Sequence, residues 1–111
     1  MFIMEILNDK DLIYEKINEN KLTLLYFSSP TCSACTAIKE KLLFELKKYP
    51  KIKAFEIPPF NNEEILAHFN IFTFPAILLY IDGKEYIREA RYISIEKLIN
   101  DIDRLYNLSL N

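Results

Sequence analysis

Residues 22–35 have the sequence LTLLYFSSPTCSAC and contain the only two cysteines of the chain. The apolar run 22–27 predicts a buried strand, and residues 36–48 predict a helix. Cys32 and Cys35 therefore lie where a strand passes into a helix. The start of a helix offers unpaired backbone N–H groups and the positive end of the helix dipole, and both stabilise a thiolate. Because the thiolate is the nucleophile in disulfide exchange, this placement indicates a dithiol/disulfide redox site.

Composition and charge narrow the class of protein. Of the 111 residues, 50% are hydrophobic and 14% are aromatic, so we expect one globular domain over residues 1–111. The formal net charge of −2 argues against a nucleic-acid partner. The chain has no polybasic run and no apolar run of membrane-spanning length, and its N-terminal apolar run breaks at Glu5. We therefore expect a cytoplasmic protein with no membrane partner, and separately we expect a monomer.

The rest of the chain alternates strand and helix patterns. We expect strands over residues 2–6, 22–28, 51–57, 76–81 and 84–90, and helices over residues 9–18, 32–48 and 63–69 and from 95 onward. Candidate helix caps are Asn8 or Asp9, Asn61 or Asn62, and Ser94. Asp82-Gly83 is a hairpin signal. The order βαβαβαββα predicts an α/β fold with a mixed central sheet flanked by helices.

This order resembles the thioredoxin family over essentially the whole chain. The features that carry the resemblance are the apolar strand, the Cys32/Cys35 pair that opens a helix, Pro75, and Gly83 in the late hairpin. The segments around Cys32 and Gly83 are similar to those of small single-domain thioredoxin-like proteins of low-GC bacteria. The resemblance implies a thioredoxin fold and a thiol–disulfide oxidoreductase with no cofactor beyond its redox-active disulfide. It implies disulfide-containing proteins as partners, with a thioredoxin reductase as a candidate for recycling.

The resemblance also implies roles for individual residues. Cys32, nearer solvent, would attack a substrate disulfide, and Cys35, one helical turn along and more buried, would resolve the mixed disulfide. Thr73 and a cis peptide bond between Phe74 and Pro75 would form a wall of the substrate groove. The alternative for Pro75 is an ordinary trans proline at the start of an edge strand.

Two residues are candidate modulators of the cysteine pKa values. Typical thioredoxins have a buried Asp six residues before the first cysteine, and this chain has Tyr26 there. A phenol with a pKa near 10 is a poor base at neutral pH, so we expect Tyr26 to be a packing residue. Glu56, on the next strand, could stand near the cysteines and serve instead of that Asp. We favour the alternative, a solvated glutamate at a strand end.

Further departures from the family pattern fall in the expected substrate groove. Thr31 replaces the usual aromatic residue before Cys32, and Ser33-Ala34 replace the usual Gly-Pro, which tunes the stability of the thiolate. Arg91 takes the place of a groove glycine. It could lower the pKa of Cys32, select acidic substrates or narrow the groove, or it could simply point into solvent.

Two other classes of function are possible. C-x-x-C supplies two of the four ligands of a zinc site, but the only histidine, His68, falls in a short polar helix, so we expect no metal. The other possibility is a specialised or non-catalytic thioredoxin-like module with an altered groove, which the substitutions Tyr26 and Arg91 support. Exposed aromatic residues near the groove could mark its partner patch, and the candidates are Phe72, Phe74 and Tyr92.

Overall fold

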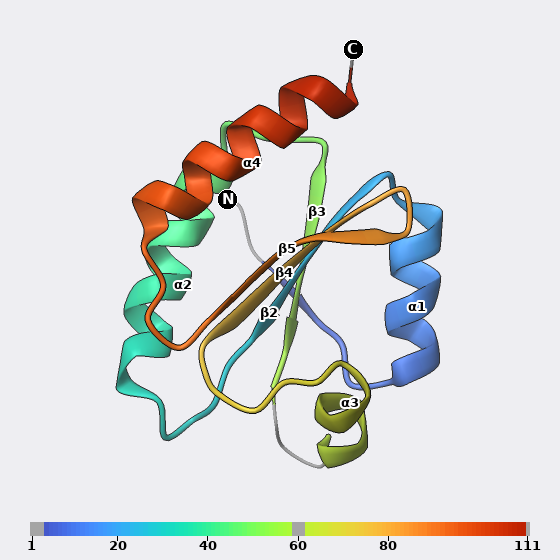
Figure 1. Cartoon of the computed structure of the whole chain (residues 1–111). Helices are drawn as coiled ribbons and strands as arrows, with labels where there is room; N and C mark the ends of the chain where they lie inside the picture. Colours follow the sequence, from blue (N-terminus) through green and yellow to red (C-terminus); the bar gives the residue numbers. More distant parts are fainter. Residues whose placement is uncertain (1–3, 59–61, 111) are drawn as a thin grey trace.

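The computed structural model describes residues 4–58 and 62–110 and contains a five-stranded sheet with helices on both faces (Figure 1). Along the chain the elements are β1 (Glu5–Ile6), α1 (Lys10–Glu19), β2 (Leu22–Phe27), α2 (Ser33–Leu46), β3 (Ile52–Ile57), α3 (Glu63–His68), β4 (Ala76–Ile81), β5 (Lys84–Ala90) and α4 (Ile95–Ser109). The predicted α/β order is confirmed. Phe2 and Ile3 of the predicted first strand, and the candidate cap Asn61, lie outside the described residues.

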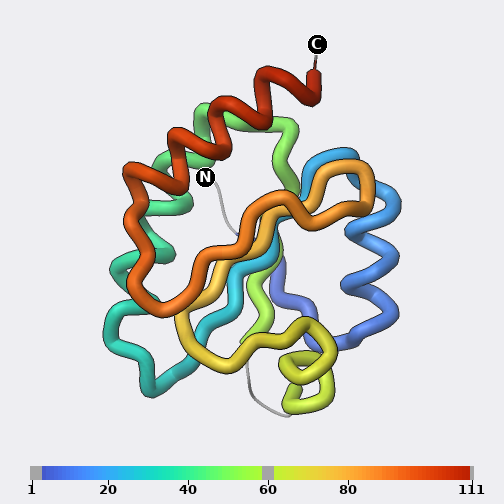
Figure 2. Tube along the Cα trace, viewed as in Figure 1, coloured from blue at the N-terminus to red at the C-terminus, as the bar shows by residue number. Residues whose placement is uncertain are grey.

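The strands are arranged in the order β1-β3-β2-β4-β5, which places β2 at the centre of the sheet. β3 runs parallel to both β1 and β2, whereas β4 is antiparallel to β2 and β5. The sheet is therefore mixed, as predicted. Figure 2 shows α2 and α4 on one face of the sheet and α1 and α3 on the other. Because both faces are covered, all six residues of β2 are buried.

The alternation of side chains along β2 divides the core into two layers. The first layer packs between the sheet and α2 and α4, and it includes Leu22, Leu24, Tyr26, Leu42, Leu46, Leu98 and Ile102. The second layer packs between the sheet and α1 and α3, and it includes Leu25, Phe27, Ile13, Ile17 and Ile65. Tyr26 consequently faces α2, the helix that begins at the cysteines.

The helix ends show which predicted caps form. Asp9 caps α1 by accepting a hydrogen bond from the Asp11 N–H at 2.9 Å, and Ser94 caps α4. Asn62 precedes α3, but its side chain makes no cap hydrogen bond. The side-chain amide of Asn62 donates instead to the carbonyl oxygen of Pro58, and Asn62 is only 3% exposed. Asn62 is therefore the N-cap residue of α3, one of the two predicted alternatives, but its side chain bonds to Pro58 and not to the first turn of the helix.

The sheet register brings three distant segments to one edge. Phe27, the last residue of β2, lies opposite Ala76, the first residue of β4, and Ala76 lies opposite Ala90, the last residue of β5. The loop that leads to the cysteines, the residue before β4 and the residue after β5 therefore meet at this edge. No helix in the described part of the chain is long and apolar enough to cross a membrane.

Candidate active site

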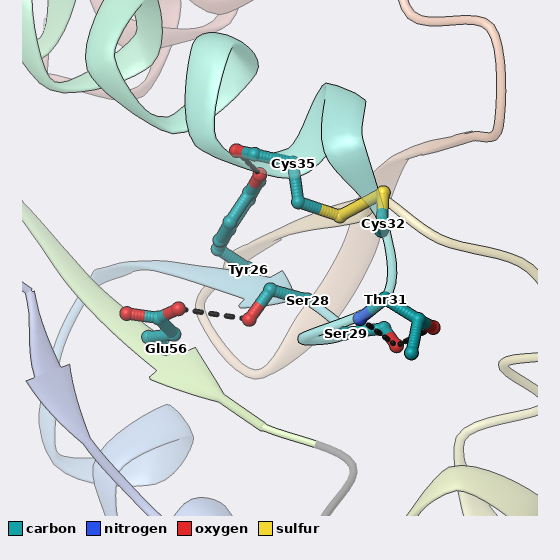
Figure 3. Close-up of a disulfide and its surroundings, with 7 residues drawn as sticks. All are labelled: Tyr26, Ser28, Ser29, Thr31, Cys32, Cys35 and Glu56. Carbon is teal, nitrogen blue, oxygen red and sulfur yellow. Dashed lines mark hydrogen bonds between the residues drawn. A yellow bond between two sulfur atoms is a disulfide. The ribbon is translucent and has the colours of Figure 1, made fainter.

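Cys32 and Cys35 form a disulfide where the loop after β2 enters α2 (Figure 3). Cys32 is the N-cap residue of α2, Cys35 lies in its first turn, and their Cα atoms are 5.4 Å apart. Cys35 is only 4% exposed, whereas Cys32 is half-buried and is flanked by exposed Thr31 and Ser33. This difference in exposure is the one expected from the sequence, and it makes Cys32 the more accessible of the two cysteines.

At the N-terminus of α2, no side chain of the helix competes with the cysteines for the positive end of the helix dipole. Within α2, all of which the structure describes, no side chain caps the N-terminus and the first turn holds no acidic residue. The first backbone N–H groups of a helix have no partner inside the helix, so they can stabilise negative charge on the N-cap sulfur. The helix start therefore favours a thiolate at Cys32 once the disulfide is reduced.

The loop before Cys32 is held by short-range hydrogen bonds. The Cys32 N–H donates to the carbonyl oxygen of Ser29 at 3.1 Å, and the Thr31 N–H donates to Ser29 Oγ at 3.4 Å. The hydroxyl oxygens of Ser29 and Thr31 lie 3.1 Å apart. These bonds fix the turn that presents Cys32 at the start of the helix.

Tyr26 packs beneath the disulfide. Its side chain is completely buried, and its hydroxyl donates to the carbonyl oxygen of Cys35 at 2.5 Å. Burial, with a smaller contribution from the charge of Glu56, raises the pKa of Tyr26 to about 12. The phenol therefore stays protonated at neutral pH, which fits the expected packing role and not that of a base.

Glu56 does not have the solvated position that we favoured from the sequence. It lies opposite Tyr26 in the pairing of β2 with β3, and its side chain is 13% exposed. The Lys39 ammonium donates to its Oε1 at 2.7 Å, and the Ser28 hydroxyl donates to its Oε2 at 2.8 Å (Figure 3 shows the Ser28 bond). The expectation was wrong because these two partners keep the carboxylate at the sheet surface beneath α2.

A cavity of about 370 Å³ brings this carboxylate together with the buried cysteine. Its lining includes Tyr26, Cys35, Lys39 and Glu56. Lys39 is a member of the site that the sequence patterns did not indicate. The spacing of four residues between Cys35 and Lys39 could have indicated it, because residues four apart share one face of a helix.

Pro75 and Arg91 meet at the sheet edge beside the loop of the cysteines. The Phe74–Pro75 peptide bond is cis, which is the isomer implied by the resemblance. The Arg91 N–H donates to the carbonyl oxygen of Pro75 at 2.8 Å. Arg91 is exposed and has a φ of 72°, and its guanidinium lies 5.1 Å from the centre of the Tyr92 ring. Within residues 4–58 and 62–110, Arg91 makes no ion pair.

The three candidate aromatic residues differ in exposure. Phe72 is 79% exposed and Tyr92 is 86% exposed. Phe74 is only partly exposed and packs against the core layer beside α1 and α3. The candidate patch is therefore limited to Phe72 and Tyr92.

The backbone of Arg91 leads to a prediction about stability. A positive φ is unfavourable for a residue with a Cβ by about 1–2 kcal/mol, whereas glycine adopts it freely but makes the unfolded chain more flexible by about 0.5–1 kcal/mol. We therefore expect Arg91→Gly to raise the free energy of unfolding, by up to about 1 kcal/mol, in guanidinium titrations of the oxidised protein. Tyr92→Gly, at a neighbouring position without positive φ, is the control and should lower it. A loss of stability in Arg91→Gly would contradict the prediction.

The described residues do not assemble the ligands of a metal centre. Across residues 4–58 and 62–110, no group of three or more His, Cys, Asp or Glu side chains is placed to hold a metal ion. His68 is exposed and forms a hydrogen bond of 2.5 Å between its Nε2 and the Tyr14 hydroxyl. The His68 ring therefore bonds to Tyr14 of α1.

Comparisons with known proteins agree with this fold. Residues 4–104 match the family model described as Thioredoxin. The thioredoxin-like protein YdfQ of Bacillus subtilis (strain 168) is 37% identical over 92 residues, which cover 83% of this chain and 82% of that protein. The thiol:disulfide interchange protein DsbD of Campylobacter jejuni (strain RM1221) is 26% identical over 106 residues, which cover 87% of this chain but only 18% of that protein.

Solved structures show the same similarity. The thioredoxin of Fasciola hepatica has a TM-score of 0.82 at 28% identity, covering 91% of this chain and 98% of that one. The thioredoxin of Trypanosoma brucei brucei also has a TM-score of 0.82, at 17% identity, covering 95% of this chain and 92% of that one. The second similarity is one of fold alone.

Proposed function

Because the chain belongs to the thioredoxin family, we propose that it is a thiol–disulfide oxidoreductase that reduces or exchanges protein disulfides through Cys32 and Cys35. The observation that carries this proposal is the asymmetry of the pair. The more exposed cysteine, Cys32, is the N-cap residue of α2, and Cys35 is a buried residue one turn further along. This is the arrangement that an attacking and a resolving thiol require.

The reaction follows from this arrangement. In the reduced protein the Cys32 thiolate attacks one sulfur of a substrate disulfide, and the other substrate sulfur leaves as a thiolate. Cys35 then attacks the Cys32 sulfur of the mixed disulfide, which releases the second substrate thiolate and forms the Cys32–Cys35 bond. Two electrons pass from the protein dithiol to the substrate, and no other cofactor is needed.

We place the substrate groove along the sheet edge next to Cys32. The register brings the segment around Phe74 and Pro75 and the residue Arg91 to the same edge as the loop of the cysteines. The proposed groove residues are Thr31, Ser33, Ala34, Thr73, Phe74, Pro75 and Arg91. Arg91 is the charged residue of this set, so we expect the groove to favour disulfides with acidic neighbours.

The proposed partners are proteins that contain disulfides. Recycling requires a two-electron reductant, and we propose a thioredoxin reductase or a small dithiol in that role. We also propose that residues 1–111 form one domain and that the protein is a cytoplasmic monomer.

A disulfide-reduction assay tests the function. We expect the protein to accelerate the reduction of insulin by dithiothreitol, followed as the turbidity of the precipitating B chain. Dithiothreitol without protein gives the background rate. A rate equal to that background would favour the alternative, a partner-binding module in which exposed Arg91, Phe72 and Tyr92 present a modified groove.

A further inference from the structure

One wall of the proposed groove belongs to the segment 70–75, which connects α3 to β4 (yellow in Figure 2). At the second end of this segment, the cis Phe74–Pro75 bond leads into β4, and the Pro75 carbonyl oxygen accepts a hydrogen bond from the Arg91 N–H at 2.8 Å. Between the ends, residues 72–73 are exposed. The position of the wall therefore also depends on what holds the first end of the segment.

The first end of the segment is the C-terminus of α3. The Asn70 N–H donates to the Ala67 carbonyl oxygen at 3.1 Å, and the Ile71 N–H donates to that of Leu66 at 2.8 Å. Together with the φ of 57° at Asn70, these bonds form a Schellman turn, which ends a helix through a left-handed residue. The turn uses the carbonyl groups of the last helical residues. It leaves those of Phe69 and Asn70 for another donor.

Arg88 of β5 supplies this donor. Its Nη2 donates to the carbonyl oxygen of Phe69 at 3.0 Å, and its Nη1 donates to that of Asn70 at 3.3 Å. The Glu85 carboxylate accepts two further bonds from the same guanidinium, one from Nε at 2.9 Å and one from Nη2 at 2.8 Å. Because the guanidinium is planar and its donors have fixed directions, these four bonds set its position. Arg88 therefore ties the end of α3 to β5.

A β-bulge places Arg88 and Glu85 side by side. The register between β4 and β5 shifts between Leu79 and Tyr80, which makes Tyr86 an extra residue of β5. In a regular strand, residues three apart point to opposite faces of the sheet. The extra residue shifts the alternation by one, so Glu85 and Arg88 share a face and bond to each other.

Packing by itself does not fix the segment against β5. A cavity of about 260 Å³ lies beside the segment, and its lining includes Phe72 and Thr73 of the segment together with Arg88 and Ala90 of β5. A segment that borders a cavity can shift into it with little loss of packing contacts. The hydrogen bonds from Arg88 therefore decide where the first end of the segment lies.

We propose that Arg88 is a positioning residue of the substrate groove, which holds the wall formed by Thr73, Phe74 and Pro75 at the distance from Cys32 that a peptide disulfide requires. This inference rests on the proposed function, and it concerns the binding of the substrate and not the chemistry of the cysteines. β5 then holds the segment at two points. These are the carbonyl groups of residues 69–70, through the Arg88 side chain, and that of Pro75, through the backbone of the residue after β5.

Two disulfides of different size test this role. One is an uncharged peptide with one internal disulfide, and the other is 2-hydroxyethyl disulfide, which is uncharged and has no peptide backbone to lie in the groove. The reduced protein is mixed with each, the reaction is stopped with acid at successive times, and mass spectrometry follows the oxidised protein. The result is a second-order rate constant for each substrate, measured at several pH values. The variants are Arg88→Gln, Arg88→Lys and Glu85→Gln.

Arg88→Gln should lower the rate constant for the peptide by about tenfold, because a displaced wall no longer aligns the peptide with Cys32. With 2-hydroxyethyl disulfide, the rate constant and its pH profile should stay within about twofold of the parent, because the helix start that stabilises the Cys32 thiolate is unchanged. Arg88→Lys should recover part of the peptide rate, since an ammonium lacks the planar fork that reaches two carbonyl groups. Glu85→Gln should cause a smaller loss, and the double variant with Arg88→Gln should be no slower than Arg88→Gln alone.

The matched control is Arg104→Gln on α4. Arg104 is exposed and forms no ion pair within residues 4–58 and 62–110, so the variant loses the same charge and should change neither rate constant. Thermal unfolding shows whether each variant is folded. If Arg88→Gln does not fold, Arg88→Lys and Glu85→Gln decide by the same comparison of the two substrates.

Two results would overturn the proposal. One is a peptide rate constant in Arg88→Gln within about twofold of the parent, and the other is an equal loss with both disulfides. Failure of the parent protein to react with either disulfide would instead reject the proposed function.

Discussion

Cys32→Ser is expected to reduce the rate of insulin reduction to that of dithiothreitol alone. A serine hydroxyl is not ionised at neutral pH and does not form a disulfide with the substrate, so the first bond of the reaction cannot form. The measurement is the turbidity assay at equal protein concentrations, with thermal unfolding of both proteins to show that the variant is folded. A variant that keeps a substantial part of the parent rate would mean that Cys32 is not the attacking residue.

Cys35→Ser is the matched companion of this experiment. It keeps the attacking thiol but removes the one that resolves, so we expect the mixed disulfide with the peptide to accumulate. Its mass should equal that of the protein plus that of the peptide, and it should disappear on reduction. If the covalent complex instead accumulates in Cys32→Ser, the two roles are reversed.

Tyr26→Ala is expected to lower the free energy of unfolding of the oxidised protein by about 3–5 kcal/mol. The side chain is fully buried between β2 and α2, so its removal costs the transfer energy of the ring and leaves a cavity. Small domains are stable by only about 5–15 kcal/mol, so the variant should be close to unfolding. Tyr26→Phe keeps the ring and loses only the bond to Cys35, which should cost about 1 kcal/mol.

Guanidinium titration of the oxidised variants measures these differences. Tyr92→Ala is the control, because its side chain is 86% exposed and its removal should change stability by no more than about 0.5 kcal/mol. Equal losses in Tyr26→Ala and Tyr92→Ala would contradict the packing role of Tyr26. If Tyr26→Phe lost as much free energy of unfolding as Tyr26→Ala, the hydrogen bond of the hydroxyl, and not the packing of the ring, would provide the stabilisation.

The order of strands and helices was predictable because it depends on patterns within each segment. The apolar run of β2 and the hairpin signal at Asp82-Gly83 have the structures that their patterns indicate. Element ends were less predictable. α2 ends at Leu46, two residues before the predicted end, because the Tyr49 N–H donates to the Leu46 carbonyl oxygen as the chain turns. Such ends depend on where the next element packs.

In the candidate site, the cysteine pair was predictable from the sequence, whereas the surroundings of Glu56 were not. Cys32 and Cys35 are three residues apart, so the helix that contains them sets their separation and their difference in exposure. The surroundings of Glu56 bring together Ser28, 28 residues away, and Lys39, 17 residues away. No pattern within one segment could show that the carboxylate is held by these two donors and not by water.

The placement of the cysteine pair at the start of a helix was thus determined by residues 22–35, because the apolar run of a strand and the geometry of one helical turn act over a few residues. The neighbours of that pair were decided by tertiary structure. Pairing of β2 with β3 placed Glu56 opposite Tyr26, and packing of α2 on the sheet brought Lys39 to the carboxylate. The register of β4 and β5 brought Pro75 to Arg91. These contacts join residues far apart in the chain, and they form only when the apolar faces of the elements are buried against one another.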